Sequence, residues 1–343
     1  MAGIKTLQIK LFFGKIALLG VLWILLSVGC AEGLARVRVI QKHMLAPSVG
    51  IAHREFEIEV DRLRVRAAQK GRPDCIFLGS SKVLDGIDPE AMQAAYEEQT
   101  GKTLICQNFG VNGMGMLGET QAALALINLY QPRLIIFGTG FQDIHSGDVD
   151  QMIAQNPWVR YNLGQFSFDG WVTNSFLSYR YYLAGIGYLT TATPQDQRDF
   201  LTWQTILPDG FHPLTGHDAK ASMDKPGTQN YIVQAESIEA IQTFMKEKSQ
   251  NTQVLFVEMP ISPAMYNNNT LAENNRSKFV NTMNTDFDKS QVKIWFTQDL
   301  NLIPDERFYD PIHLNATGAK ILSAWIGEEL GKAVKNGALA LPN

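Results

Sequence analysis

The segment Cys75–Pro89 reads CIFLGSSKVLDGIDP. A short apolar run ends at Gly79, two serines and a polar turn follow, and Asp88-Pro89 opens a helical pattern. This order predicts a strand, a tight turn and a helix. A hydroxyl at the carboxyl end of a strand lies where open α/β sheets place their ligands. The segment therefore predicts an α/β unit with a serine at its functional edge, although a plain Gly-Ser-Ser connector has the same local appearance.

Apolar strand patterns alternate with helical patterns on both sides of one long interruption. Short links between such strands require right-handed crossovers onto a parallel sheet. We therefore expect an α/β fold of the flavodoxin-like kind, a three-layer sandwich with a central five-stranded parallel sheet. The expected strands are 75–79, 103–108, 134–137, 254–258 and 292–296, and the expected helices are about 89–99, 118–130, 235–248, 272–286 and 316–334.

The interruption, about 145–230, is rich in Trp, Tyr and Phe and then becomes polar and turn-rich. We interpret it as an insertion of loops and small helices over the active face, not as a separate domain. Two explanations of the aromatic residues remain open. They either pack small helices onto the edge of the sheet, or they line a substrate site.

The composition is that of an ordinary globular protein. Of 343 residues, 45% are hydrophobic and 19% are charged, and the formal net charge is −4. This charge, without a basic stripe, argues against nucleic-acid binding. The cysteines Cys30, Cys75 and Cys106 lack metal-ligand spacing, and no metal or organic cofactor is predicted. Buried free thiols are the default interpretation of Cys75 and Cys106, but a disulfide is the alternative if their strands are neighbours.

The N-terminus carries an almost wholly apolar run from Leu11 to Val28, with lysines before and at its start. Its length is close to the roughly 20 residues that cross a bilayer. We predict that residues 1–32 are an uncleaved membrane anchor, with the body outside the cytoplasm. A lipoprotein modified at Cys30 and an ordinary cleaved signal peptide remain alternatives.

The rest of the chain divides into three parts by composition. Residues 33–72 are expected to be a charged connector with helical character that holds the domain away from the membrane. Residues 73–334 form the expected α/β domain, including the insertion. Residues 335–343 are expected to be a frayed tail.

Candidate catalytic groups come from both ends of this domain. A serine nucleophile needs a base within hydrogen-bond reach, and the base needs an orienting group. His313 follows Asp310 by three residues in a loop before the last helix, so both side chains can face one site. Oxyanion donors could come from the glycine loop 108–113 and from the loop 140–143. Each feature alone has a plain structural interpretation.

Together, four ordered blocks resemble those of the SGNH, or GDSL-type, hydrolase superfamily. They are LGSS at 78–81, NFGVNG at 108–113, GFQD at 140–143 and DPIH at 310–313. The resemblance covers 73–143 and 254–330. It implies a catalytic triad and an oxyanion hole made of the following residues: Ser81, Asp310 and His313 for catalysis, and the N–H groups of Ser81 and Gly113 with the amide of Gln142 for the oxyanion.

Two positions depart from the family pattern. Ser80 stands where the family has an aspartate, and Gln142 stands where it has an asparagine. Glutamine keeps an amide donor but extends it by one methylene, and a misplacement of about 1 Å can cost around 10²-fold in rate. The loop is either set back to compensate, or the enzyme is impaired.

The resemblance implies a membrane-anchored, extracytoplasmic serine esterase or acyltransferase that works through an acyl-serine. An acylated cell-envelope glycan or lipid is the expected substrate, and envelope-assembly proteins are the expected partners. The alternative is a catalytically impaired SGNH-like protein that binds a glycan or a protein through the aromatic insertion. A nucleotide-binding protein is disfavoured because the loop 108–118 lacks the Gly-x-Gly-x-x-Gly spacing.

Overall fold

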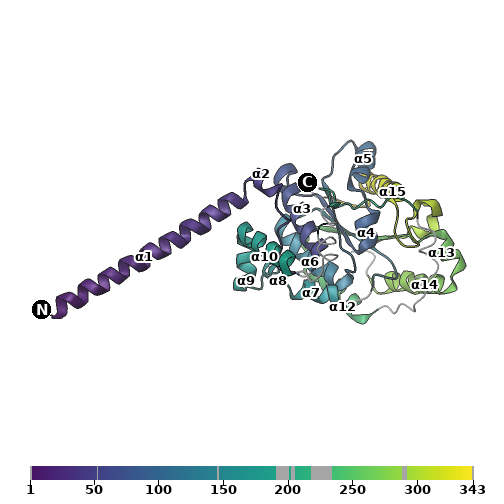
Figure 1. Ribbon diagram of the computed structural model, residues 1–343. Helices are drawn as coiled ribbons and strands as arrows, with labels where there is room; N and C mark the ends of the chain where they lie inside the picture. Colours follow the sequence, from purple (N-terminus) through teal and green to yellow (C-terminus); the bar gives the residue numbers. More distant parts are fainter. Residues whose placement is uncertain are drawn as a thin grey trace.

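A computed structural model describes residues 2–51, 53–144, 147–190, 201, 205–217, 234–287 and 292–341, with side chains from residue 15 onward. A long helix, α1 (Ala2–Ala35), projects from an α/β body (Figure 1). The short helix α2 (Arg38–Gln41) leads from it into that body.

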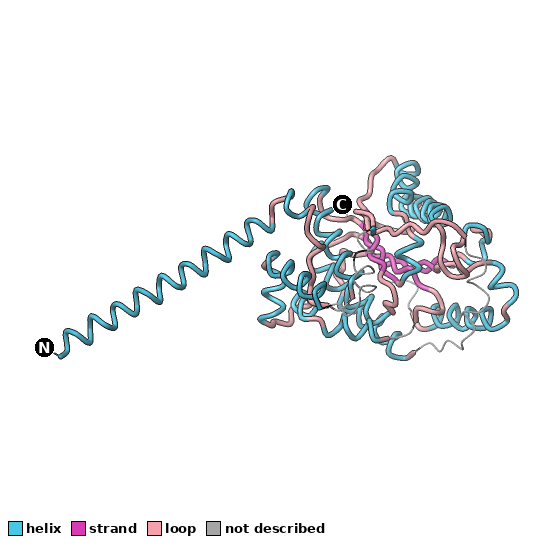
Figure 2. Tube along the Cα trace, viewed as in Figure 1, coloured by secondary structure: helices cyan, strands magenta, loops and turns pink. Residues whose placement is uncertain are grey.

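Five parallel strands run through the centre of the body, between helices (Figure 2). Their order is β2-β1-β3-β4-β5. The expected three-layer α/β fold with a five-stranded parallel sheet is therefore confirmed. Because the chain changes direction across the sheet at β1 and β3, the carboxyl ends of these two strands flank a crevice where such folds bind ligands. The strands are β1 (Cys75–Gly79), β2 (Cys106–Gly110), β3 (Leu134–Thr139), β4 (Gln253–Glu258) and β5 (Lys293–Trp295).

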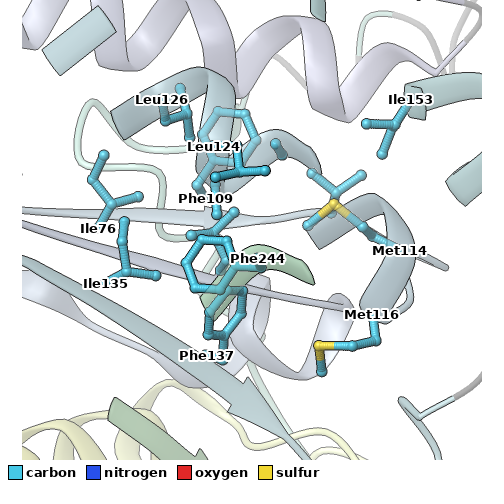
Figure 3. Packing of buried hydrophobic residues seen from close by; sticks show 14 of the residues in the cluster. Ile76, Phe109, Met114, Met116, Leu124, Leu126, Ile135, Phe137, Ile153 and Phe244 are labelled. Atoms are coloured by element: carbon cyan, nitrogen blue, oxygen red, sulfur yellow. The ribbon is translucent and has the colours of Figure 1, made fainter. Parts of the chain in front are cut away.

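Each strand contributes alternate side chains to two separate cores. Ile76 and Leu78 of β1 enter the core that includes α6 (Met116–Tyr130) and α12 (Ala235–Glu247) (Figure 3). In this core the ring of Phe137 lies 5.2 Å from that of Phe244. A fully buried side chain of this size contributes roughly 1.5–3 kcal/mol to the free energy of unfolding.

Phe77 of β1 points into the opposite core, with α5 (Pro89–Thr100) and α15 (Ala316–Lys335). These two helices pack against each other. Beyond β4 the chain forms α13 (Pro263–Asn268) and α14 (Thr270–Thr285), and the 3-10 turns η2 (Gln298–Leu300) and η3 (Asp305–Arg307) precede α15.

Two expected boundaries near the serine are wrong. The predicted turn after β1 is a short helix, α4 (Ser81–Gly86), because Ser80 caps it by accepting a hydrogen bond from the Lys82 N–H. The predicted strand 103–108 lies instead at β2 (Cys106–Gly110), since β2 pairs with β1 along its whole length.

The expected connector 33–72 is wrong over its second half. The helix α3 (Arg54–Lys70) packs on the body, and Phe56 meets Phe109 of β2 edge-on at 5.4 Å. Val60 and Leu63 are buried in the same core. Every residue from Glu55 to Asp61 is buried, so the first half of this helix is enclosed by the body.

The expected frayed tail is also wrong for the part that the structure describes, which ends at residue 341. Leu339 is buried in the core beside α15, and its N–H donates to the carbonyl of Ala333. The Lys293 ammonium donates to the carbonyl of Ala338. Leu341 packs against the same core, so two apolar side chains and these hydrogen bonds hold the segment on the body.

Four helices form the described first part of the insertion: α7 (Asp148–Gln155), α8 (Pro157–Asn162), α9 (Phe168–Ser175) and α10 (Leu177–Thr190). α7 and α8 pack against α6, and Trp158 is buried in the core. Packing therefore explains this aromatic residue, whereas Phe166 and Phe168 face outward. Much of the rest of the insertion lies outside the described residues.

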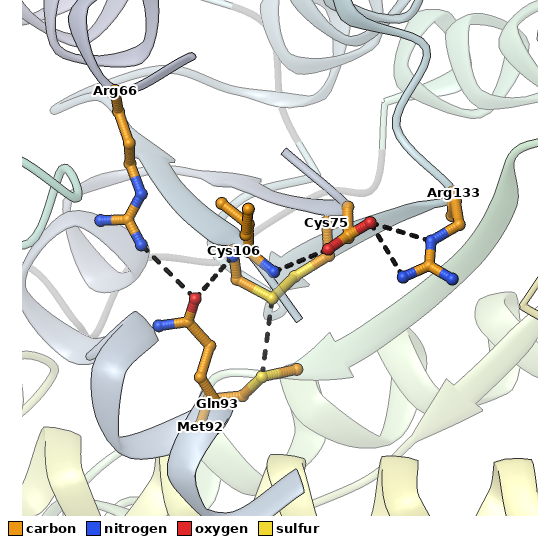
Figure 4. Close-up of a disulfide and its surroundings, with 8 residues drawn as sticks. Arg66, Cys75, Met92, Gln93, Cys106 and Arg133 are labelled. Carbon is orange, nitrogen blue, oxygen red and sulfur yellow. Dashed lines mark hydrogen bonds and ion pairs between the residues drawn. A yellow bond between two sulfur atoms is a disulfide. The ribbon is translucent and has the colours of Figure 1, made fainter. Parts of the chain in front are cut away.

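Cys75 and Cys106 stand opposite each other on β1 and β2 and form a disulfide (Figure 4). The default expectation of free thiols is therefore wrong, and the alternative is right. The strand register explains this, because it brings two cysteines 31 residues apart to adjacent positions. Cys30, on α1, is an exposed free thiol.

Candidate active site

Ser81, His313 and Asp310 form a hydrogen-bonded chain. The Oγ of Ser81 lies 2.8 Å from the Nε2 of His313, and the Nδ1 of His313 lies 2.8 Å from the Oδ2 of Asp310. The histidine and aspartate side chains are mostly buried. An ionised carboxylate only accepts hydrogen bonds, so the proton lies on Nδ1 and leaves Nε2 to accept the hydrogen of the Ser81 hydroxyl.

Three glycines allow α4 to hold Ser81 over the strand ends. Gly79 pairs with Gly110 on one side and with Gly138 on the other, so they form a row across the ends of β2, β1 and β3. A Cβ on Gly110 would lie 2.1 Å from the Leu84 nitrogen, and one on Gly138 would lie 2.3 Å from a methyl of Val83. Only glycine permits this close approach.

The buried side chain of Asn108 fixes the end of the same helix. Its Nδ2 donates to the carbonyls of Val83 (2.7 Å) and Ile87 (2.8 Å), and its Oδ1 accepts from the N–H of Gly110 (2.8 Å). Asn108 therefore adds a second hydrogen bond at the Val83 carbonyl, which also accepts from the Ile87 N–H, and supplies one to the Ile87 carbonyl, at the end of the helix where carbonyls lack helical partners. Ser81 is thus carried by a rigid element.

The loop 308–314 positions the base through its own backbone. The Oδ1 of Asp310 accepts from the N–H groups of Ile312 and His313, both at 2.9 Å. The carbonyl of His313 accepts from the N–H of Tyr309 at 2.8 Å. Burial by itself would raise the pKa of Asp310, but the hydrogen bonds and charge of His313 and the two backbone N–H groups outweigh it and lower that pKa. Asp310 is therefore ionised and holds the imidazole in one orientation.

Lys82, the residue after the serine, orients the side chain of Gln142. The Lys82 ammonium is buried, lies 2.5 Å from the Oδ2 of Asp143, and lies 3.4 Å from the Oε1 of Gln142. An ammonium only donates hydrogen bonds, so the Gln142 atom that faces it must be the oxygen. The Nε2 of Gln142 is then directed away from Lys82. Asp143 in turn accepts from the N–H of Gly140 at 2.8 Å, which fixes the loop after β3.

Gly113 has a φ of +72°, a conformation that favours glycine. The adjacent loop residue is held from α3, because the N–H of Asn112 donates to the Oε2 of Glu55 at 2.6 Å. Glu55 is buried, and burial raises its pKa to about 7, against the lowering effect of the Asn112 hydrogen bond. The segment that follows the N-terminal helix therefore holds the glycine loop in place.

A second histidine–aspartate pair joins α4 to the insertion. Asp85 follows Ser81 by four residues, so both lie on one side of this helix, and the Oδ1 of Asp85 is 2.7 Å from the Nδ1 of His212. The hydrogen bond from Asp85 raises the pKa of His212, and burial raises the pKa of Asp85. His212 comes from the described part of the insertion at 205–217.

The structure joins Ser81, Asp310 and His313 directly, and it puts Gly113 and Gln142 in loops that follow β2 and β3. Four residues that were not predicted from the sequence also belong to this region: Lys82, Asp85, His212 and Glu55. A lysine and an aspartate inside an otherwise apolar segment were the available signals for Lys82 and Asp85. Nothing local pointed to His212 or Glu55, because only the fold brings them near α4.

The arrangement suits nucleophilic chemistry at a carbonyl or related centre. It offers a hydroxyl, a base with a defined tautomer, and a carboxylate that orients the base. Among the described residues, no three His, Cys, Asp or Glu side chains are grouped so that they could hold a metal ion.

No protein-family profile matches the sequence, and no curated protein matches it significantly. Among solved structures, a lipase from a goat rumen metagenome is 11% identical over 75% of this chain and 96% of the lipase, with a TM-score of 0.37. An acetyl xylan esterase, Est2A, from the rumen bacterium Butyrivibrio proteoclasticus is 12% identical over 77% of this chain and 63% of the esterase, with a TM-score of 0.30. Scores this low support no functional inference, since one fold hosts many activities.

Proposed function

We propose that this protein is a membrane-anchored serine esterase or acyltransferase of the SGNH type. The observation that supports it most is the hydrogen-bonded chain from Ser81 through His313 to Asp310, with both distances at 2.8 Å. Ser81 and the Asp310–His313 loop come from opposite ends of the domain, so a local sequence effect cannot account for the contact between Ser81 and His313.

The reaction begins with proton transfer. The Nε2 of His313 removes the proton of Ser81 as its Oγ attacks the carbonyl carbon of an ester. The resulting oxyanion is stabilised by the N–H groups of Ser81 and Gly113 and by the amide of Gln142. His313 then gives its proton to the leaving alcohol oxygen, the carbon–oxygen bond breaks, and an acyl-Ser81 ester remains.

The second half of the reaction frees the serine. His313 takes a proton from water or from an acceptor hydroxyl, which attacks the acyl-serine, and the proton then returns to the Ser81 oxygen. Asp310 keeps the imidazole oriented in both halves. Water as the acceptor gives hydrolysis, and a hydroxyl acceptor gives acyl transfer.

Gln142 is compatible with the oxyanion role. Its contact with Lys82 directs the amide nitrogen away from the ammonium, so the longer side chain is restrained. The alternative is an impaired protein that only binds a glycan or a protein partner, and the labelling experiment below distinguishes the two.

Two observations support a location outside the cytoplasm with attachment through α1. The helical stretch Lys15–Ala35 contains an 18-residue window with a mean hydropathy of 2.0 and no buried residue, as expected of a membrane span or a signal sequence. The Cys75–Cys106 disulfide is typical of an oxidising compartment. An acylated envelope glycan or lipid is the substrate class that fits this location.

The test is covalent labelling of the purified full-length chain in detergent by a fluorophosphonate, with p-nitrophenyl acetate turnover measured in parallel. S81A should lose both labelling and turnover. The matched control S80A removes the neighbouring, buried serine, should cost about 1 kcal/mol through the lost helix cap, and should keep both activities. Full activity of S81A would overturn the assignment. Product analysis with a carbohydrate acceptor against water then separates transfer from hydrolysis.

A further inference from the structure

Large apolar side chains gather on the outward faces of α9 and α10. Beyond residue 44 the described chain exposes ten of them, and six lie between 166 and 189. We call these six the aromatic face: Phe166, Phe168, Trp171, Tyr182, Ile186 and Leu189. Phe166 is 76% exposed and Leu189 is 75% exposed. Single exposed apolar residues are normal, but a gathering of them marks an interaction site.

On each of the two helices, these apolar side chains lie next to one another. On α10, Tyr182, Ile186 and Leu189 are four and three residues apart and therefore share one side of the helix. On α9, the rings of Phe168 and Trp171 lie 5.7 Å apart. The two helices contact each other.

The last turn of α1 is bound to the first turn of α10. The carboxylate of Glu32 accepts from the N–H of Leu177 (3.1 Å), and from both the N–H and the hydroxyl of Ser178 (2.9 Å each). These N–H groups have no partner within their own helix. Ala35 packs with Leu177 and Tyr181 in a small buried cluster beside them.

The hydrogen bonds from Leu177 and Ser178 to Glu32, which we call the joint, fix the depth of α10 relative to a bilayer. The apolar run Leu11–Val28 is about 27 Å long as a helix, which is close to a hydrocarbon core of about 30 Å. Glu32 follows Val28 by four residues, about 6 Å along the helix, so α10 begins just beyond that core. α9 and α10 also lie on the side of the body from which α1 projects (Figure 1).

The composition of the face suits lipid headgroups and the upper acyl chains. Residues 161–190 contain only two charged residues, Asp169 and Arg180, and the side chain of Arg180 is buried and donates to the carbonyl of Ser48. Trp, Tyr and Phe favour the membrane interface. Arg36, just after the span, pairs with Glu32 at 2.6 Å.

We propose that the aromatic face rests in the interfacial layer of the bilayer that α1 crosses. The inference depends on the proposed membrane attachment through α1. The body is then held at two places, by the span and by the face, and the joint at Glu32 keeps them in one geometry.

The experiment uses the full-length chain in vesicles of phosphatidylcholine and phosphatidylglycerol. In a C30A background, spin labels are attached at F168C or L189C, and at L300C as the matched control. Leu300 is also an exposed apolar residue, at 47%. It lies in η2, whose Asp299 pairs with Arg276 of α14, and α14 lies on the opposite side of the body from α1 (Figure 1). Cys75 and Cys106 are paired and take no label. The expected result is a ratio of oxygen to nickel-chelate accessibility several-fold higher at 168 and 189 than at 300.

The outcomes separate this inference from the anchor on which it depends. Release of the protein by alkaline carbonate would overturn both. A carbonate-resistant protein with the same accessibility ratio at 168, 189 and 300 would overturn the aromatic face alone. Spin–spin broadening with low accessibility to both reagents would assign the face to a second copy of the chain and also overturn it. Fluorophosphonate labelling of each variant reports that the body is folded.

Discussion

Replacing Asp310 with Asn should remove most of the activity while the fold persists. Asparagine retains one oxygen for the N–H groups of Ile312 and His313, which Asp310 now binds at 2.9 Å. Its NH2 group would face the Nδ1 of His313, where a carboxylate oxygen now lies at 2.8 Å. Two donors cannot share this position, so the ring proton moves to Nε2. Nε2 then can no longer accept the proton of Ser81.

The expected size of this effect follows from the loss of the base. A triad histidine held in the wrong tautomer lowers kcat by about 10⁴-fold, which corresponds to about 5 kcal/mol in the activation free energy. The free energy of unfolding should fall by only about 1–3 kcal/mol, because one charge-assisted hydrogen bond is lost and two backbone hydrogen bonds remain.

The assay is kcat for p-nitrophenyl acetate in the wild type, D310N, S81A and the double variant, with thermal unfolding followed in parallel. If the three groups act as a unit, the double variant is no slower than S81A. The control is D305N, in the same region, where the Asp305 side chain accepts from the N–H of Ala264 at 2.9 Å, and its kcat should be unchanged. Activity of D310N within about tenfold of the wild type would refute the role of Asp310 as the orienting group.

Three further changes test the surroundings of the site. K82M leaves the buried carboxylate of Asp143 without its ammonium and should lower the free energy of unfolding by about 3–5 kcal/mol in urea titrations. G110A should lower it by about 1–3 kcal/mol or more, because the added Cβ would lie 2.1 Å from a backbone nitrogen. The control G185A, with nothing within 4 Å, should be neutral or stabilising. Burial raises the pKa of Glu55 from 4.5 to about 7. The contribution of this side chain to the free energy of unfolding is therefore fully present below about pH 4.5 and is lost as the pH rises to about 7. Between these two pH values, the free energy of unfolding of E55Q should therefore rise by about 3 kcal/mol relative to that of the wild type.

Each of these has an outcome that contradicts it. Equal urea midpoints for K82M and the wild type would mean that Asp143 has another partner. Equal changes in the free energy of unfolding for G110A and G185A would mean that α4 does not pack closely against the strand ends. A difference between E55Q and the wild type that does not vary with pH would show that Glu55 keeps an ordinary pKa.

Much of the fold could be predicted because its signals are local. A strand buried on both faces is a short apolar run, and Phe77, Phe137 and Phe256 each lie in such a run. A helix start can be predicted from its capping residue in the same way. At Asp88-Pro89, the Asp88 side chain accepts from the N–H groups of the first turn. The errors at α3 and at Leu339 arose because burial of an apolar face depends on a distant surface being available.

The sequence by itself determined the α/β class, the apolar N-terminal helix, and the candidate residues Ser81, Asp310 and His313. These depend on residue type and short spacing, which are properties of a few consecutive positions. Only the tertiary structure decided which distant groups meet. The strand order paired Cys75 with Cys106, aligned three glycines beneath α4, and brought Lys82 to Gln142. The physical reason is that contacts between segments depend on register and packing of the whole sheet, which no single stretch of the chain encodes.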